Sequence, residues 1–247
     1  MSSKIITVWG KDNSGKTTFA VNLACALANR DHLVGLISSN LIYGDLQVYF
    51  GQSIPPEKGL FRALHEDNPN VGEKFMETGE SKNLFFLSVP NHYTGLLCDS
   101  VSLQSVERLI TASSLLFDIL LIDGSGDLTN PISGVGLWLA EKVYTLYRPS
   151  ASAPMWHKGV EDFVQELHIA DKQINVMQTP NGEFDDKTFK SLIELSFKYE
   201  LPFVKQAGEL ENAGTPVFFY EDRGCRRYSK VLEKISDELC GGTDKYK

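Results

Sequence analysis

Short, continuous apolar runs alternate along the chain with segments of helical length, and polar or glycine-rich turns separate them. Such runs are typical of strands buried on both faces, and their alternation with helices is typical of a parallel sheet. The pattern therefore predicts an α/β fold, a mostly parallel twisted sheet with helices on both faces. The expected strands span residues 5–9, 33–37, 84–89, 119–122, 143–147 and 174–177, with later short runs near Phe203 and over 217–220. The expected helices span residues 16–29, 103–114, 157–169, 185–199 and 226–239.

The breaks between these elements are short, and the chain contains no internal repeat and no low-complexity tract. We therefore expect a single domain over residues 1–247. After the strand at 33–37 we expect a loop, because the sequence there contains Gly44, Gly51, Pro55 and Pro56.

Composition narrows the function classes. With 42% hydrophobic and 23% charged residues, the chain is an ordinary globular sequence, which excludes disorder as its main state. A net charge of −8 argues against a protein whose whole surface coats nucleic acid. The four cysteines form no Cys-x-x-Cys pair and the five histidines are scattered, so we expect reduced thiols and no zinc site. We see no signal peptide and no run long enough to span a membrane, so we expect a cytoplasmic protein.

The most informative segment is residues 10–18, which fit the phosphate-binding pattern G-x-x-x-x-G-K-[ST]. Glycines let the backbone turn its N–H groups onto phosphate oxygens, the lysine brings a positive charge, and the threonine hydroxyl suits Mg²⁺. The segment follows an expected strand and opens an expected helix, whose positive end would lie under the phosphates. It therefore predicts a P-loop NTPase that binds nucleotide through Gly10, Lys11, Asp12, Asn13, Ser14, Gly15, Lys16, Thr17 and Thr18.

A second half of the phosphate site follows the expected strand at 119–122. Asp123 stands at the tip of this apolar run, where a carboxylate binds Mg²⁺ through its water shell, opposite Thr17. Taken alone, Asp123 could equally be a strand-end cap. Together with the loop, it predicts a magnesium site formed by Thr17 and Asp123.

The loop also carries a second lysine, Lys11, directly after its first glycine. This arrangement resembles the deviant Walker A motif, G-K-G-G-x-G-K-[ST]-[ST], of the ParA/MinD family of dimerising ATPases. Residues 38–46, Ser-Ser-Asn-Leu-Ile-Tyr-Gly-Asp-Leu, resemble the switch I segment of the CpaE/TadZ branch. Residues 117–123 resemble the family's Walker B strand, and residues 201–203 with 211–217 resemble its purine-side segment.

The resemblance implies an ATP-dependent sandwich dimer with two ATP molecules and Mg²⁺ at the interface. Lys11 would then reach the nucleotide of the partner subunit, where a cation neutralises phosphate charge. A solvated surface lysine is the alternative for this residue. We include Gln178 and Pro202 among the predicted nucleotide-binding residues, and Lys11, Lys16, Asn40 and Asp45 among the candidate catalytic residues.

Two departures from the family pattern bear on hydrolysis. Asp12 and Asn13 replace the usual Gly-Gly, and a carboxylate at position 12 would repel the γ-phosphate. Asn40 aligns with the family's water-orienting aspartate, and an amide cannot accept a proton from water as a carboxylate does. Asp45, further along the same loop, is the alternative candidate. We expect ATP binding with slow or absent hydrolysis, although Asn40 could equally do no more than tune a slow ATPase.

Two functions remain open. The first is a nucleotide-switched homodimer of the CpaE/TadZ kind, which positions pilus or secretion machinery through a partner protein located at a cell pole. The second is a ParA-type ATPase that binds DNA non-specifically, since Arg223, Arg226, Arg227 and Lys230 form a basic group among acidic residues. We expect no membrane insertion, because the end of the chain is polar and the apolar stripe at Val231, Leu232, Ile235 and Leu239 suits core packing.

Overall fold

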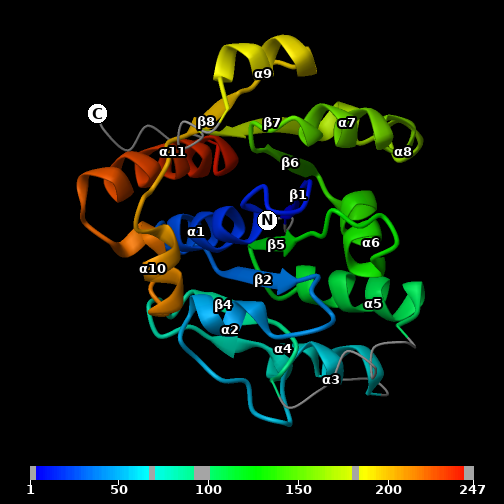
Figure 1. The fold of residues 1–247 in the computed structure, drawn as a ribbon. Coiled ribbons are helices and arrows are strands. Elements are labelled where there is room, and N and C mark those ends of the chain that lie inside the picture. Colours follow the sequence, from blue (N-terminus) through cyan, green and yellow to red (C-terminus); the bar gives the residue numbers. More distant parts are fainter. Residues whose placement is uncertain (1–3, 67–69, 92–100, 180–183, 242–247) are drawn as a thin grey trace.

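The computed structural model describes residues 4–66, 70–91, 101–179 and 184–241 (Figure 1). One of the four cysteines, Cys98, and the polar residues 242–247 lie outside the described residues. Within the described part, none of the helices combines the length and the apolar character needed to cross a membrane.

Over the described residues, an eight-stranded sheet forms the centre of the molecule, in the order β3-β4-β2-β5-β1-β6-β7-β8. Neighbouring strands are parallel except at one edge, where β3 runs antiparallel to β4. This arrangement confirms the expected fold class. The strands are β1 Lys4–Gly10, β2 Val34–Ser38, β3 Met76–Glu77, β4 Leu84–Leu87, β5 Ile119–Asp123, β6 Lys142–Tyr147, β7 Gln173–Gln178 and β8 Tyr199–Leu201.

Helices cover both faces of the sheet (Figure 1). Side chains of β5 alternate between the two faces: Ile119 and Leu121 belong to one buried cluster, and Leu120 and Ile122 to the other. The first face is covered by α1 Lys16–Ala28, α2 Asp45–Tyr49, α10 Ala207–Asn212 and α11 Arg223–Leu239. The second is covered by α3 Leu60–His65, α4 Val71–Lys74, α5 Leu103–Ser114, α6 Pro131–Leu139, α7 Ser152–Gly159, α8 Glu161–Glu166 and α9 Asp186–Ile193.

Several expected elements differ from the structure. The helix expected over 157–169 is two short helices, α7 and α8, and the helix expected over 185–199 ends at Ile193. It stops there because Glu194 adopts a left-handed conformation, with φ of 54°. The strand near Phe203 is instead β8, which pairs with β7, and the loop expected after 33–37 contains α2.

The strand expected over 217–220 is wrong: Val217–Phe219 form a 3₁₀ helix. Asn22 on α1 explains the difference, because its side-chain oxygen accepts a hydrogen bond from the Phe218 amide at 2.7 Å. This bond satisfies a backbone donor that a sheet would otherwise pair, while Val217 packs into the core beside α1.

The apolar stripe of α11 packs into the core, as expected. Leu232, Ile235 and Leu239 are buried, and the helix lies against α1 (Figure 1). Its Asp222 N-cap accepts hydrogen bonds from the amides of Gly224 and Cys225. The helix therefore belongs to the folded body, and its apolar face is not available to a membrane.

We expect Leu232→Ala to lower the free energy of unfolding by about 2 to 5 kcal/mol, because it removes a fully buried side chain between α11 and α1. Arg227→Ala on the exposed face of the same helix is the matched control, with an expected change within about 0.5 kcal/mol. Urea denaturation measures both. A loss of less than about 1 kcal/mol for Leu232→Ala would contradict a core role for this stripe.

Candidate functional site

The loop between β1 and α1 is wound so tightly that glycine is required at both ends. Gly10 and Gly15 have φ values of 145° and 84°, in the region that side chains disfavour. A Cβ atom on Gly10 would lie 2.4 Å from the carbonyl oxygen of Leu146, and one on Gly15 would lie 2.2 Å from Nε2 of Gln178. The glycines of the motif thus let the loop lie against β6 and against the end of β7.

Beside this loop, at the start of α1, lies a hollow of about 470 Å³, which we call the loop hollow. Lys16 lines it with only 10% of its side chain exposed, and its Nζ donates to the carbonyl oxygen of Lys11 at 3.0 Å. Burial lowers the pKa of Lys16, whereas the carboxylates of Asp123 and Asp12 oppose that effect. The ammonium group is therefore held in place with little water around it. The lining residues are Asn13, Gly15, Lys16, Thr17, Thr18, Tyr49 and Arg148.

Asp12 is the nearest acid to this lysine. Its Oδ1 lies 3.7 Å from Nζ of Lys16, and 77% of its side chain is exposed. An ion pair this exposed contributes little to stability. Asp12 also lies close to Gly126, where an added Cβ would meet Oδ1 at 2.9 Å. Without nucleotide, Asp12 is thus a partner of Lys16, and a phosphate group would have to compete with it.

Asp123 lies at the carboxyl end of β5, beside the loop. Its Oδ2 accepts a hydrogen bond from Oγ1 of Thr17 at 2.7 Å. Its Oδ1 is buried with no hydrogen-bond partner among the described residues. Burial, and next the charge of Asp45, raise the pKa of Asp123 to about 7. A buried, unpaired oxygen whose charge is disfavoured is what a cation would satisfy, so Thr17 and Asp123 fit a magnesium ion.

No group of three or more His, Cys, Asp or Glu side chains suited to a metal occurs among the described residues. A magnesium ion here would therefore keep water and phosphate oxygens as most of its ligands, which is the ion's usual preference. The structure thus brings together the two predicted magnesium residues, but it offers no closed cage of protein ligands.

Asp45 supplies a second carboxylate at this end of the sheet. Its Oδ1 accepts hydrogen bonds from Oγ of Ser38 at 2.8 Å, from the Leu46 amide at 2.8 Å and from Oγ of Ser88 at 3.2 Å. Burial raises the pKa of Asp45, although these hydrogen bonds favour its charged form. Asp45 also lines a smaller hollow of about 120 Å³, together with Thr17, Tyr43, Val48, Tyr49 and Glu211.

Asn40 has a local role in the same segment. Its Oδ1 accepts hydrogen bonds from the amides of Ile42 at 3.0 Å and Tyr43 at 3.2 Å, which is typical of an Asx turn. The side-chain oxygen that would orient water is therefore already used in the turn. Asp45 instead lines a hollow together with Thr17, and its charge acts on Asp123.

A third, more apolar hollow of about 190 Å³ adjoins the loop hollow. Gln178 and Pro202, both predicted to bind nucleotide, line it, and Nε2 of Gln178 lies 3.4 Å from the carbonyl oxygen of Gly15. The hydroxyl of Tyr228 is buried there without a partner among the described residues. We call this the apolar hollow; its lining residues are Asn13, Gly15, Thr18, Arg148, Gln178, Pro202, Phe203, Val204, Ala207, Val217 and Tyr228.

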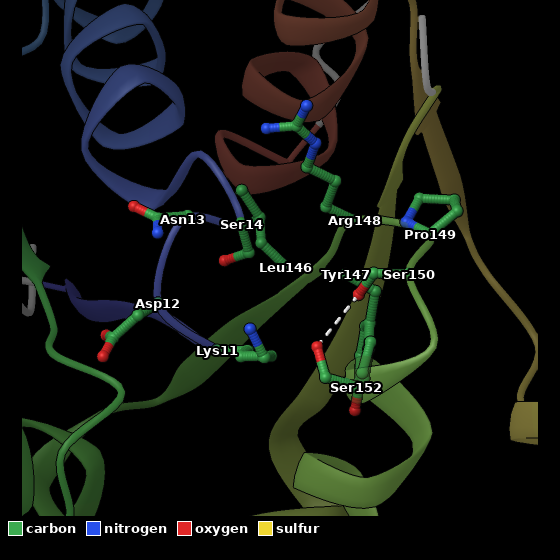
Figure 2. Close-up of a pocket in the computed structure, with 11 residues that line it drawn as sticks. Lys11, Asp12, Asn13, Ser14, Leu146, Tyr147, Arg148, Pro149, Ser150 and Ser152 are labelled. Atoms are coloured by element: carbon green, nitrogen blue, oxygen red, sulfur yellow. Dashed lines mark hydrogen bonds between the residues drawn. The ribbon is translucent and has the colours of Figure 1, made fainter. Parts of the chain in front are cut away.

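Lys11 lies on another side of the loop (Figure 2). It lines a fourth hollow of about 230 Å³ together with Ser14, Arg148, Ser150 and Ser152, among others, and it does not line the loop hollow. In Figure 2 its side chain points towards Ser152. The two lysines of the motif therefore line different hollows: Lys16 lines the loop hollow, and Lys11 lines the hollow beside Ser150 and Ser152.

Tyr49 and Arg148 line the loop hollow without any signal in the sequence, and Glu211, expected only as part of the purine-side segment, lines the smaller hollow of Asp45. The Tyr49 hydroxyl lies 3.1 Å from Oγ1 of Thr18, which connects α2 to the start of α1. Burial raises the pKa of Glu211, and the charge of Asp45 adds to that rise. These residues reach the site through the packing of α2, α10 and the segment after β6, which a local motif does not encode.

No family model matches this chain. A curated relative, the septum site-determining protein MinD of Thermotoga maritima, is 23% identical over 253 residues, covering 98% of this chain and 89% of MinD. MinD of Pyrococcus horikoshii, solved with Mg-ADP, superposes with a TM-score of 0.81 at 18% identity, covering 99% and 100% of the two chains. A ParA family ATPase from Chlorobium tepidum gives a TM-score of 0.80 at 16% identity, covering 97% and 100%.

These similarities extend over nearly the whole chain and nearly the whole of each relative. The chain therefore has the P-loop fold of the MinD and ParA ATPases. At these identities the likeness of structures concerns the fold, so nucleotide binding and partners have to be argued from the site itself.

Asp123→Asn tests the charge at the end of β5. Since the folded state raises the pKa of Asp123 above its unfolded value, ionisation of this group lowers stability as the pH rises from about 4 through about 7. Without Mg²⁺ and nucleotide, we therefore expect the variant to exceed wild type in unfolding free energy by on the order of 1 kcal/mol at pH 8, and by less at pH 5. Denaturation at both pH values measures this difference. A variant less stable than wild type at pH 8 would contradict it.

Proposed function

We propose that this protein binds ATP with Mg²⁺ across the loop hollow and the apolar hollow, and that the bound nucleotide switches it between monomer and homodimer. The observation that carries the proposal is the pair formed by Thr17 and Asp123, where a buried carboxylate oxygen lacks a partner beside a P-loop. Lys16 and the positive end of α1 would hold the phosphates. Gln178 and Pro202 would hold the base in the apolar hollow.

Each residue has a distinct task in this proposal. Lys16 neutralises the β- and γ-phosphates and gives up its contact with Asp12 when it does so. Thr17 and Asp123 would hold a magnesium ion, which would supply charge neutralisation to the phosphates. Tyr49 fixes Thr18 through its hydroxyl, so that a nucleotide contact at Thr18 is transmitted to α2.

The position of Lys11 supports a role in a second subunit. Because Lys11 lines the hollow beside Ser150 and Ser152 and not the loop hollow, it is poorly placed for its own nucleotide. Across a two-fold interface the same side chain would meet the partner's phosphates, where a cation lowers repulsion between the two nucleotides. The sequence resemblance to deviant Walker A ATPases points to the same arrangement.

Two substitutions separate nucleotide binding from assembly. We expect ATP with Mg²⁺ to convert wild type into a dimer, Lys16→Ala to weaken ATP binding at least about tenfold, and Lys11→Ala to keep monomer binding but lose the dimer. Calorimetry and light scattering with size exclusion measure the two steps. Unchanged ATP affinity in Lys16→Ala would contradict the P-loop assignment, whereas a normal ATP dimer in Lys11→Ala would contradict only the role across the interface.

We propose that hydrolysis is slow or absent. The Asn40 oxygen is engaged in its turn, and Asp12 brings a negative charge to the edge of the loop hollow. Asp45 is the remaining carboxylate of this segment, and it is held by Ser38 and Ser88 close to Asp123. A long-lived ATP-bound dimer follows, since phosphoryl transfer depends mainly on positioning and on charge neutralisation.

Asn40→Asp keeps the acceptor oxygen of the turn and adds a carboxylate, so we expect ATP turnover to rise about tenfold or more. Adding Asp12→Gly should raise turnover further if both residues act on the same step. Phosphate release at saturating ATP and Mg²⁺ measures the rate, with Lys16→Ala as the contamination control. If Asn40→Asp leaves the rate unchanged while Asp45→Asn lowers it, then Asp45 is the residue that positions the water.

For the cellular role, we propose that the protein positions a pilus or secretion assembly by binding a partner protein located at a cell pole. Support comes from residues 38–46, with Gly44 and Asp45, which resemble the CpaE/TadZ segment. The similarity to MinD, a protein named for determining the septum site, fits a positioning role in general.

A partition ATPase that binds DNA is the second candidate, because Arg223, Arg227 and Lys230 are exposed along one side of α11. Arg226 is paired with Glu221, and Glu233 and Asp237 follow on the same helix. We therefore expect no retention of DNA by the ATP-bound protein at about 0.15 M salt, measured by fluorescence anisotropy with a mixed-sequence duplex. Salt-dependent retention that the triple substitution of Arg223, Arg227 and Lys230 by alanine abolishes would favour the partition role instead.

A further inference from the structure

Arg148 stands at the boundary between the two hollows of the proposed nucleotide site. The loop hollow and the apolar hollow share four lining residues, namely Asn13, Gly15, Thr18 and Arg148. The first three come from the loop and from the start of α1. Arg148 comes from the end of β6 and faces them from the other side, and it is the one charged residue among the four.

The backbone around Arg148 is well fixed although the side chain is exposed. Tyr147 before it and Pro149 after it are both buried. The proline also restricts Arg148 to extended conformations, because its ring excludes the helical region for the preceding residue. In Figure 2 the Arg148 side chain extends away from Lys11, Ser150 and Ser152. The backbone at Arg148 is thus fixed, and its guanidinium group extends away from Lys11 although both residues line the hollow of about 230 Å³.

The place between the two hollows corresponds to one part of a nucleotide. Lys16 and Thr17 line only the polar end, where the β- and γ-phosphates would bind. Gln178 and Pro202 line only the apolar end, where the base would bind. A nucleotide that spans both must therefore pass the shared residues with its α-phosphate and ribose.

The charges around the loop hollow favour a contact between Arg148 and the α-phosphate. Asp12 offsets part of the charge of Lys16, and Lys11 faces another hollow, so the loop hollow has few cations for a triphosphate. A guanidinium group presents N–H donors in a planar fork that matches two phosphate oxygens. We propose that Arg148 binds the α-phosphate of the bound nucleotide from the β6 side, opposite Thr18. This inference rests on the proposed function, and it adds a nucleotide-binding residue outside the P-loop.

The experiment compares ligands that differ by one group. AMP has the α-phosphate and adenosine lacks it, so their ratio of affinities reports contacts to that phosphate. Calorimetry is run with Mg-ADP, AMP and adenosine on wild type, Arg148→Ala, Arg148→Lys and Lys16→Ala. Lys158→Ala is the matched control, because it removes an exposed cation of α7 that pairs with Glu161 and lines none of the four hollows of the site.

We expect Arg148→Ala to bind AMP and Mg-ADP about tenfold to a hundredfold more weakly than wild type, with adenosine unchanged. Arg148→Lys should recover part of the loss, since it keeps the charge but lacks the fork. Lys158→Ala should match wild type. Thermal melting without ligand checks that Arg148→Ala is folded.

Two results would overturn the role of Arg148 but leave the proposed function standing. In the first, Arg148→Ala binds AMP and Mg-ADP as wild type does, while Lys16→Ala does not. In the second, adenosine loses as much affinity as AMP, which would assign Arg148 to the base or the ribose. If folded wild type binds none of the nucleotides, the proposed function fails and this inference fails with it.

Discussion

The site depends on one buried carboxylate at the carboxyl end of the central strand β5. Asp123 ends this strand between Val8 of β1 and Ser38, the last residue of β2. Its charge is disfavoured by burial and by Asp45, and only Thr17 and the nearby Lys16 act in its favour. In such a low-dielectric environment a bound cation would stabilise the carboxylate, because it would pair with Oδ1, which has no hydrogen-bond partner among the described residues.

The neighbouring elements connect this carboxylate to the rest of the molecule. Asp45 and Tyr49 both belong to α2; one is hydrogen-bonded to Ser38 on β2, and the other lies against Thr18 on α1. A cation bound at Thr17 and Asp123 would change the electrostatic potential at Asp45 and Tyr49 of α2. The segment at 38–49 is therefore physically suited to respond to nucleotide, and its exposed Ile42 and Tyr43 would carry the response to the surface.

The polar and apolar ends of the proposed site come from different parts of the fold. The polar end is formed by contiguous residues of the P-loop, whereas the apolar end joins β7, the turn after β8, α10 and α11. Sequence patterns therefore located the first end almost completely, with Gly10, Gly15, Lys16 and Thr17. Of the second they named Gln178, Pro202 and the purine-side segment with Phe203 and Val217. They did not find Tyr228, because its contribution depends on how α11 packs against α1.

The sequence by itself determined strands β1, β2, β4, β5, β6 and β7, helices α1, α5 and α11, and the phosphate loop. Each of these follows from local chemistry: continuous apolar runs make buried strands, and only glycine tolerates the backbone of Gly10 and Gly15. The tertiary structure decided the rest. It divided the expected helix at 157–169, it made Val217–Phe219 a 3₁₀ helix through Asn22, and it brought Tyr49 and Arg148 to the loop hollow. Contacts between segments distant in sequence depend on how whole elements pack, and a single chain's residue pattern does not specify that packing.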